Sequence, residues 1–532
     1  MRLAAMPLTA RFRWKLLPAV LVAALGDWLF YQRDFYAGGF GLFALGLLAA
    51  LVAGRRAILR AGPSLAATAG AALFGIALLY DPSLLAWALF WIAAGMATLL
   101  PATARFDDGW RWAQRLIWQA LRAPFGPLLD AVRLAKLRSA GRTRRTSARI
   151  AFSVLALPLA GSAVILALFA AANPLIESAL STLVPHDWNL GTAIARSMLW
   201  SVCFIMAWSL LRPSLARRLL SSVPAIGEQG LPGVSVASVT VSLVLFNLIF
   251  AAQNLLDIAY LWGIAPMPQR MTMAQYAHRG AYPLIVTALL AALFVLVALR
   301  PGSTTAQAAA IRRLVTLWIA QNIFLVGSSM LRTIDYVEAY SLTRLRIAAL
   351  LWMGLVAFGL AAICWRTLRG RSAPWLINVN LGAAALVLTV CCFVDLGAIA
   401  ARWNVTHARE VGGQGAALDL CYLGELQDSA LLSMLALERR PGLPTEFANR
   451  VRSVRTRVYV DLDRHQAKDW SLLRQWRLSE ARERVQSLPA RQLGTGPRGC
   501  DGALLPPPPV VAAPPIPHPT TTPTPALTGR SR

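Results

Sequence analysis

The chain has 532 residues, of which 57% are hydrophobic and only 14% are charged, whereas soluble globular domains are usually about 25% charged. The net charge is +27, and nearly all of the basic residues are arginine. This composition excludes an ordinary soluble protein. It also argues against nucleic acid as a partner, because the arginines occupy the loop positions that membrane topology predicts.

Long apolar segments recur along most of the chain. Each is long enough to cross the ~30 Å hydrocarbon core of a bilayer as a helix. The first segment resembles a signal peptide, but Asp27 interrupts it and no small-residue cleavage site follows, so we interpret it as a membrane helix. We predict about eleven transmembrane helices, at residues 15–31, 38–54, 64–80, 83–101, 150–172, 191–211, 233–261, 282–299, 312–331, 346–366 and 375–399.

Arginines are concentrated in alternate loops between these segments. With a cytoplasmic N-terminus, every cytoplasmic loop carries at least three basic residues, and no outer loop carries more than three. The positive-inside rule therefore predicts an odd number of spans, with the N-terminus inside and the C-terminal region outside. We expect a multi-pass protein of a bacterial inner (plasma) membrane with a periplasmic C-terminal region.

The composition divides the chain into five parts. They are helices one to four (1–101), a basic amphipathic cytoplasmic segment (102–149), core helices five to eleven (150–400), a helical extracytoplasmic region (401–500) and a disordered Pro/Thr-rich tail (501–532). Tryptophans interleaved with arginines in 102–149 favour an amphipathic helix on an anionic leaflet, although an ordinary basic loop is the alternative. The predicted fold class is all-α, a polytopic transmembrane helical bundle with a small extramembrane C-terminal region.

Several strings in the second half of the chain carry a family resemblance. They are LFNLIFAAQNLLDIAYLWG and YAHRGAYPL between residues 245 and 300, DYVEAYSLTRLR within 329–360, and FVDLGAIAARWNVTHAREVGGQG within 393–426. Over roughly residues 150–490 the sequence resembles the bacterial domain-of-unknown-function family numbered 4173. This resemblance implies an uncharacterised multi-pass membrane protein and supplies no reaction, ligand or catalytic residues.

Polar and ionisable side chains gather toward the predicted outer membrane face. Charged residues inside a membrane are functional candidates, because lipid does not solvate them. We favour contacts between helices or an interfacial position over a ligand or proton site. From their depth we expect Asp257 and Arg332 to form an ion pair. The candidate polar vestibule comprises Asn247, Asn254, Asp257, His278, Arg279, Arg332, Asp335, Glu338, Arg344 and Asp395.

Three smaller features have open interpretations. In the QYAHRG loop, His278 can titrate near neutral pH and Arg279 can bind a phosphate or carboxylate, unless the loop is only a structural turn. The DYVEAYSLTRLR string favours a structural ion-pair network over a cation site. Cys421 and Cys500 lie in the predicted periplasmic region, where a disulfide and two free thiols are both open.

The sequence contains no HExxH, GxSxG, P-loop or dinucleotide-binding motif, so it indicates no catalytic, cofactor-binding or metal-binding residues and does not favour an enzyme. We expect a non-catalytic membrane component such as a sensor, regulator or envelope assembly factor. A transporter or channel for a small molecule, ion or lipid is the alternative, and a membrane-embedded enzyme is the second. The expected partners are the lipid bilayer, an anionic lipid at 102–149 and a protein on the extracytoplasmic side.

Overall fold

In the residues that it describes, the computed structural model consists of helices joined by turns and loops. The described residues are 8–60, 62–103, 106–139, 190–216, 235–261, 308–488 and 496–505, with isolated positions at 162, 169, 173, 175, 286, 290, 294 and 494. The described part contains one isolated β-bridge, between Arg498 and Leu504, and no strand. The predicted spans at 150–172 and 282–299 lie almost wholly outside the described residues, and so do His278 and Arg279.

Nine of the described helices are long and apolar enough to cross a membrane. By length and composition, these helices indicate a multi-pass membrane protein, while the eleven spans and their orientation remain predictions. The nine are α1 (Leu8–Gly26) continuing into the π-helix η2 (Asp27–Gln32), α2 (Ala37–Gly54), α3 (Gly62–Tyr80), α4 (Leu84–Thr103), α9 (Leu190–Leu211), α10 (Val236–Leu261), α13 (Ala309–Tyr340), α14 (Arg344–Arg369) and α15 (Ala373–Cys391).

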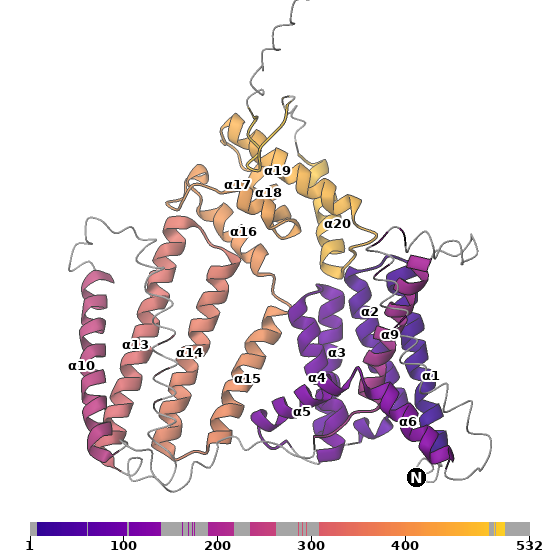
Figure 1. Ribbon diagram of the computed structural model, residues 1–532. Helices are drawn as coiled ribbons and strands as arrows, with labels where there is room; N and C mark the ends of the chain where they lie inside the picture. Colours follow the sequence, from indigo (N-terminus) through magenta and orange to yellow (C-terminus); the bar gives the residue numbers. More distant parts are fainter. Residues whose placement is uncertain are drawn as a thin grey trace, which may run out of the picture.

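The membrane helices form two groups, one of α1–α4 with α9 and one of α10, α13, α14 and α15 (Figure 1). Each group has its own apolar core. Phe43, Phe90 and Trp208 are fully buried in the first, while Leu243 and Trp318 are buried in the second. The core thus lies inside each helical group, and side chains on the outer faces are left for lipid.

Helix α10 shows this outer face clearly. Val241, Leu248 and Leu255 recur at seven-residue intervals, which place them on one side of a helix, and each is more than 60% exposed. A continuous apolar stripe of this kind would cause aggregation in water, whereas lipid tails cover it without cost. The exposed stripe therefore supports a membrane position for α10.

Two short helices and a tight turn lie at the end of the first group where α1 begins (Figure 1). They are η3 (Arg56–Leu59), α5 (Gly109–Arg122) and α6 (Gly126–Ser139). Asp108 caps α5 by accepting a 2.9 Å hydrogen bond from the amide of Arg111. Helix α5 also reaches the second group, because the amide of Gly109 donates to Oδ1 of Asn378 on α15 at 2.9 Å.

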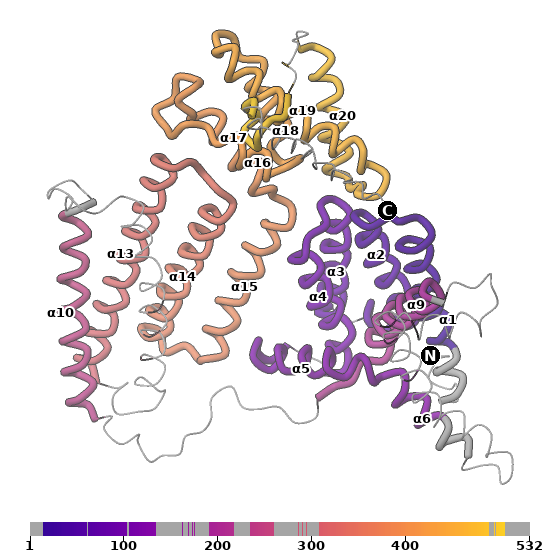
Figure 2. The backbone as a smooth tube through the Cα atoms, turned by 45° about the horizontal axis from the view of Figure 1, so that its top comes forward, coloured from indigo at the N-terminus to yellow at the C-terminus, as the bar shows by residue number. Residues whose placement is uncertain are grey.

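The C-terminal helices form a separate domain at the opposite end of the membrane helices from α5 and α6 (Figures 1 and 2). Its core contains Leu423, Leu431, Met434 and Val451, all fully buried. The helices of this domain are α16 (Leu396–His407), η4 (Arg409–Val411), α17 (Leu420–Glu425), α18 (Asp428–Glu438), α19 (Thr445–Arg464) and α20 (Leu472–Gln486).

A disulfide joins Cys421 at the start of α17 to Cys500, which lies 79 residues later. The open question about these two cysteines is therefore resolved in favour of the bond. The other four cysteines are free. The bond attaches the segment beyond α20 to the body of the C-terminal domain.

The predicted span at 375–399 is wrong beyond residue 391. Helix α15 ends at Cys391 and a new helix, α16, begins at Leu396. The reason is Asp395, whose Oδ1 accepts hydrogen bonds from the amides of Gly397 at 2.7 Å and Ala398 at 3.1 Å. A side chain that caps a helix in this way starts that helix.

The predicted span at 312–331 is too short at its C-terminal end. Helix α13 continues to Tyr340 because no glycine or proline interrupts residues 331–340. It stops at Ser341, which has a positive φ of 70°. Arg332, Asp335 and Glu338 therefore lie within the helix, whereas the sequence suggested that they follow it.

Candidate functional site

Asp257 on α10 and Arg332 on α13 form an ion pair between the two helices. Their side chains are only 2% and 8% exposed. The Asp257 carboxylate also accepts hydrogen bonds from Nε2 of Gln253 at 2.9 Å and from Oγ of Ser328 at 2.7 Å. The predicted ion pair is thus confirmed, and it lies between helices that match the requirements for membrane spans.

The same seam between α10 and α13 contains two more predicted vestibule residues. Oδ1 of Asn247 accepts from Nε2 of Gln321 at 2.8 Å, and Nδ2 of Asn247 donates to the carbonyl of Leu314 at 3.1 Å. Nδ2 of Asn254 donates to the carbonyl of Gln321 at 3.3 Å. These are the interhelical bonds that polar side chains make when water is absent.

The remaining described vestibule residues lie elsewhere. Asp335 and Glu338 are exposed on α13, and no ion pair links either of them to Arg344 in the described part of the chain. Arg344, at the start of α14, donates instead to Oγ of Ser429 in the C-terminal domain at 3.0 Å. Asp395 also belongs to that domain. The structure therefore places Asn247, Asn254, Asp257 and Arg332 in the seam, Arg344 and Asp395 at the C-terminal domain, and Asp335 and Glu338 in neither group.

A second ion pair crosses the first helical group. Nε and Nη2 of Arg196 on α9 each donate to a carboxylate oxygen of Asp27 at 2.6 Å. This bidentate geometry is the strongest that an arginine and a carboxylate form. The sequence placed both charges near the outer face, but it contained no indication that residues so far apart in the chain would meet.

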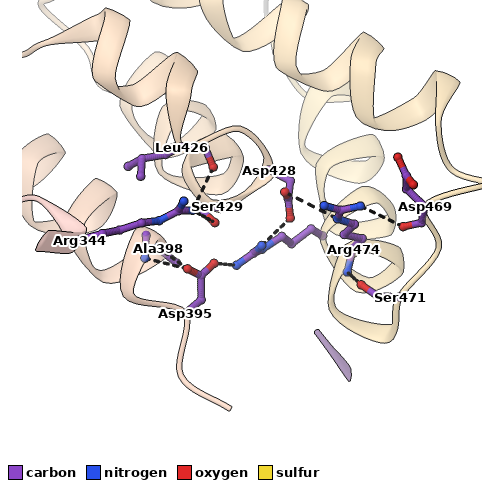
Figure 3. Close-up of polar contacts among 11 residues, drawn as sticks. Arg344, Asp395, Ala398, Leu426, Asp428, Ser429, Asp469, Ser471 and Arg474 are labelled. Carbon is purple, nitrogen blue, oxygen red and sulfur yellow. Dashed lines mark hydrogen bonds and ion pairs between the residues drawn. The ribbon is translucent and has the colours of Figure 1, made fainter. Parts of the chain in front are cut away.

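The charges at the C-terminal domain form a network that we call the charged junction, made of Asp81, Asp395, Asp428, Arg474 and Arg477. Arg477 on α20 donates to both Asp395 and Asp428, with 2.5 Å between its Nη1 and Oδ2 of Asp428. Figure 3 shows Asp395 and Asp428 on either side of this link, with Arg474 beyond. The side chain of Arg477 is 6% exposed, so its charge depends on these carboxylates for stabilisation.

In the junction, charge pairing and burial have opposite effects on the pKa values of Asp395 and Arg477. Burial acts to raise the pKa of Asp395, but the charge of Arg477 and several hydrogen bonds outweigh it and hold that pKa below its ordinary value. Burial likewise acts to lower the pKa of Arg477, but Asp428 and Asp395 reverse the effect and raise it. Both groups are therefore charged at neutral pH.

Asp81 brings the first helical group into the junction. It lies in the turn between α3 and α4, close enough to Arg477 and Arg474 of α20 for their charges to act on it. Burial raises its pKa, and the negative charges of Asp395 and Asp428 raise it further. Asp81 is thus the carboxylate of the junction whose charge its surroundings disfavour.

A cavity of about 550 Å³ opens beside the junction in the C-terminal domain. Asp428 and Arg474 belong to both the cavity wall and the junction. The wall also includes both cysteines of the disulfide. Its ionisable side chains are the acids Glu425, Asp428, Asp461 and Asp469 and the bases Arg457, Arg464, His465 and Arg474.

The composition of this wall determines what the cavity can hold. Carboxylates and guanidinium groups face a common space, together with apolar contributions from Trp470 and Leu478. The volume falls within the range of small-molecule sites. No group of three or more His, Cys, Asp or Glu residues that could hold a metal occurs among the described residues. A small molecule with charges of both signs fits these groups best.

The rim of the cavity also contacts the first helical group. The amide of Tyr36 donates to the carbonyl of Lys468 at 3.1 Å, and Nζ of Lys468 donates to Oδ2 of Asp34 at 3.0 Å. Trp470 lines the cavity and packs against Phe35. The C-terminal domain is therefore attached to both groups of membrane helices.

Sequence reasoning identified Asp395 and Arg344 but missed Asp81, Asp428, Arg474 and Arg477. Each is an ordinary polar residue in a turn or a polar helix, where charged side chains are usually solvated. The available indication was the spacing of Arg474 and Arg477, which places both on one face of α20. Their partners are visible only once the chain is folded.

Comparisons with known proteins address the family of the chain. A family model described as "Domain of unknown function (DUF4153)" matches residues 67–437. The chain belongs to this family. The match to DUF4153 supports the expectation of a family of unknown function, but it does not confirm the number 4173. No curated protein and no solved structure matches the chain. The DUF4153 match ends within α18, so it includes Asp81, Asp395 and Asp428 but not the two arginines of the junction.

Proposed function

We propose that this DUF4153 protein is a non-catalytic membrane sensor or regulator that binds a small polar molecule in its C-terminal domain. The observation that carries the proposal is that Asp428 and Arg474 belong to both the cavity wall and the charged junction. A molecule that binds there changes the charges around Arg477. Because Arg477 also holds Asp395, the change reaches the segment that follows membrane helix α15.

A second route supports coupling to the first helical group. Trp470 forms part of the cavity wall, and its carbonyl accepts a 2.7 Å hydrogen bond from the amide of Gly38 at the start of α2. A ligand that displaces Trp470 must therefore disturb this contact. Regulation requires two states that a ligand binds unequally, and the two attachments are where such states can differ.

The ligand class follows from the charges of the wall. Four acidic and four basic side chains line the cavity, so a zwitterion can place its ammonium near carboxylates and its carboxylate near a guanidinium. Free amino acids and dipeptides have these groups and fit within 550 Å³. They are the first probes to use.

The test measures the melting temperature of the full-length protein in detergent with a panel of amino acids and dipeptides. At least one probe should raise the melting temperature of the wild type but not that of Asp469→Asn or Arg474→Gln. Arg484→Gln is the control, because Arg484 lies on α20 with Arg474 but does not line the cavity. This variant should respond like the wild type. The proposal is wrong if no probe acts, or if the cavity variants respond like the control.

The regulatory part of the proposal has its own readout. Hydrogen–deuterium exchange should change on ligand binding at residues 36–41 and 392–398, which connect the domain to the two helical groups. Changes confined to the cavity wall would show binding without coupling. That result would reject the sensor and leave a simple binding protein.

The proposed location is a bacterial inner membrane, with the N-terminus in the cytoplasm and the C-terminal domain in the periplasm. The alternating arginines support this orientation. The disulfide supports it as well, because such bonds persist in the periplasm and are rare in the cytosol. A phosphatase reporter that is active only in the periplasm, fused after Leu505, should be active. An inactive fusion would reverse the orientation.

A transporter or channel is a second candidate, and the Asp257–Arg332 pair is the observation that favours it. Buried charges within membrane spans often mark an ion or proton path. If so, Asp257→Asn abolishes proton-coupled or ion-coupled uptake in proteoliposomes while the protein remains folded. If the pair is only structural, the same variant loses thermal stability and no uptake depends on it.

A further inference from the structure

A basic cavity lies at the end of the first helical group where α5 and α6 are found, far along the helices from the C-terminal domain (Figure 1). Its volume is about 240 Å³. Five cationic side chains line it, and Asp130 is the one carboxylate among the lining residues. The cations come from five different elements: Lys15 (α1), Arg55 (after α2), Arg122 (α5), Arg133 (α6) and Arg212 (after α9).

The single carboxylate is already engaged. Oδ2 of Asp130 accepts from Nε of Arg212 at 3.0 Å, and Oδ1 accepts from Nη2 of the same guanidinium at 3.0 Å. The indole of Trp208 also donates to Asp130 at 3.2 Å. Asp130 therefore neutralises Arg212, and the cavity keeps an excess of positive charge from the other cations.

Arg55 is the residue that most needs a partner. Its terminal nitrogen Nη1 is buried and has no hydrogen-bond partner among the residues that the structure describes. Burial lowers the pKa of Arg55, and the nearby charge of Arg212 lowers it further. A buried guanidinium nitrogen without an acceptor is costly, and an anion in the cavity removes that cost.

The depth of the cavity matches the level of lipid phosphates. Arg55 directly follows the last residue of the α2 span, Gly54, and Arg212 directly follows the last residue of the α9 span, Leu211. Lipid phosphates lie just outside the hydrocarbon core, at this level.

The adjacent face of α5 has the form of an interfacial helix. Ile117, Trp118 and Leu121 are exposed, followed by Phe125 in the turn before α6. On the opposite side, Trp112 and Gln119 are buried. An exposed apolar row beside basic side chains is the pattern of a helix lying in a membrane surface.

We propose that this cavity binds the phosphate group of an anionic ligand, with Arg55 and Arg122 as the principal contacts. The ligand chemistry has two sources, the headgroup of an anionic phospholipid and free phosphate. The exposed face of α5 favours the lipid, because its acyl chains can cover Ile117 and Leu121. This proposal is independent of the function of the C-terminal domain.

The test uses delipidated full-length protein in a neutral detergent. Melting temperature and native mass spectrometry report binding of dioleoyl phosphatidylglycerol, dioleoyl phosphatidylcholine and inorganic phosphate at constant ionic strength. Phosphatidylglycerol should bind and stabilise the wild type more than phosphatidylcholine does. Stabilisation by inorganic phosphate as well would show that the phosphate alone suffices, while its absence would make the lipid the ligand.

The variants locate the site. Arg55→Gln should weaken phosphatidylglycerol binding by about tenfold or more, because it removes a charge-assisted contact. Arg60→Gln removes the same charge from an exposed position in the turn after η3 and should bind like the wild type. If Arg55→Gln fails to fold, Arg122→Gln replaces it with the same expectation. Equal binding by Arg60→Gln and the cavity variant, or no preference for phosphatidylglycerol, overturns the proposal.

Discussion

The amide of Gly38 donates a 2.7 Å hydrogen bond to the carbonyl of Trp470. This contact holds the start of membrane helix α2 against the loop before α20, across more than four hundred residues of chain. A Cβ atom at position 38 would lie 2.7 Å from Cε3 of Trp470 and 2.8 Å from its carbonyl oxygen. Only glycine allows so close an approach.

Gly38→Ala should therefore loosen the C-terminal domain from the first helical group. Overpacking at such a contact costs about 1–3 kcal/mol. Hydrogen–deuterium exchange at residues 466–478 should become faster. Gly62→Ala, where the added atom meets open space at the start of α3, is the matched control and should leave exchange there unchanged. Equal exchange in the two variants would mean that the contact does not hold the domain.

Arg477→Met should strongly destabilise the C-terminal domain. Arg477 is buried between Asp395 and Asp428, and removing one partner of a buried ion network costs about 3–5 kcal/mol. Arg482→Met, on the same helix, removes an exposed arginine paired with Asp463 and should cost about 0–1 kcal/mol. Thermal unfolding of both variants measures the difference. Similar melting temperatures would exclude a structural role for the junction.

Asp81→Asn should stabilise the protein at neutral pH. Because the folded-state pKa of Asp81 is raised by burial and by Asp395 and Asp428, the folded protein holds its proton more tightly than the unfolded chain does. The stability from this residue is complete below its unfolded pKa of about 4 and is lost as the pH rises through the folded pKa. Asparagine does not ionise, so the Asp81→Asn variant keeps this stability at neutral pH.

The measurement for Asp81 compares melting temperatures across the pH range. The advantage of Asp81→Asn should be largest at neutral pH and should shrink as the pH falls toward about 4. Glu483→Gln, which removes an exposed carboxylate from α20, is the control and should show no such trend. An Asp81→Asn advantage that grows at low pH would contradict the assignment.

Asp395 has the opposite pH dependence. Because its folded-state pKa is lowered, it stabilises the folded protein above pH about 4, and this stability is lost as the pH falls through the folded pKa.

The double variant Cys421→Ser with Cys500→Ser should destabilise the C-terminal domain by about 4 kcal/mol, because the bond closes a loop of 79 residues. Because both cysteines line the cavity, ligand binding should weaken as well. Cys391→Ser, which removes a free thiol, is the control. Maleimide labelling with and without reductant reports the bond directly. Labelling of both cysteines in the untreated protein would show that the bond is absent.

The membrane helices could be predicted from the sequence because their cause is local. A helix crosses a bilayer when one continuous segment is apolar, and this property does not depend on the rest of the chain. The segments at 38–54 and 64–80 accordingly agree with α2 and α3 within two residues. The end of the 375–399 segment was wrong, because Asp395 caps a new helix there. The apolar pattern continues through this break and therefore does not reveal it.

The Asp257–Arg332 pair is a contact between distant residues that the sequence could predict. Each residue is unusual in its own apolar helix, and only a few charges share that depth, so the partner could be inferred. Arg477 lies in a polar helix where a charge is ordinary. Its partners Asp395 and Asp428 are 82 and 49 residues away and meet it only through the packing of α16, α18 and α20.

The sequence by itself determined that this DUF4153 protein is helical, multi-pass and apolar, because those properties follow from composition and periodicity within single segments. The tertiary structure decided which charges meet. It placed Asp428 and Arg474 in a cavity wall, and it left Arg55 beside a basic cavity, where no described residue accepts a hydrogen bond from its Nη1. Burial and charge pairing depend on neighbours that are distant in the chain, so these sites exist only in the folded protein.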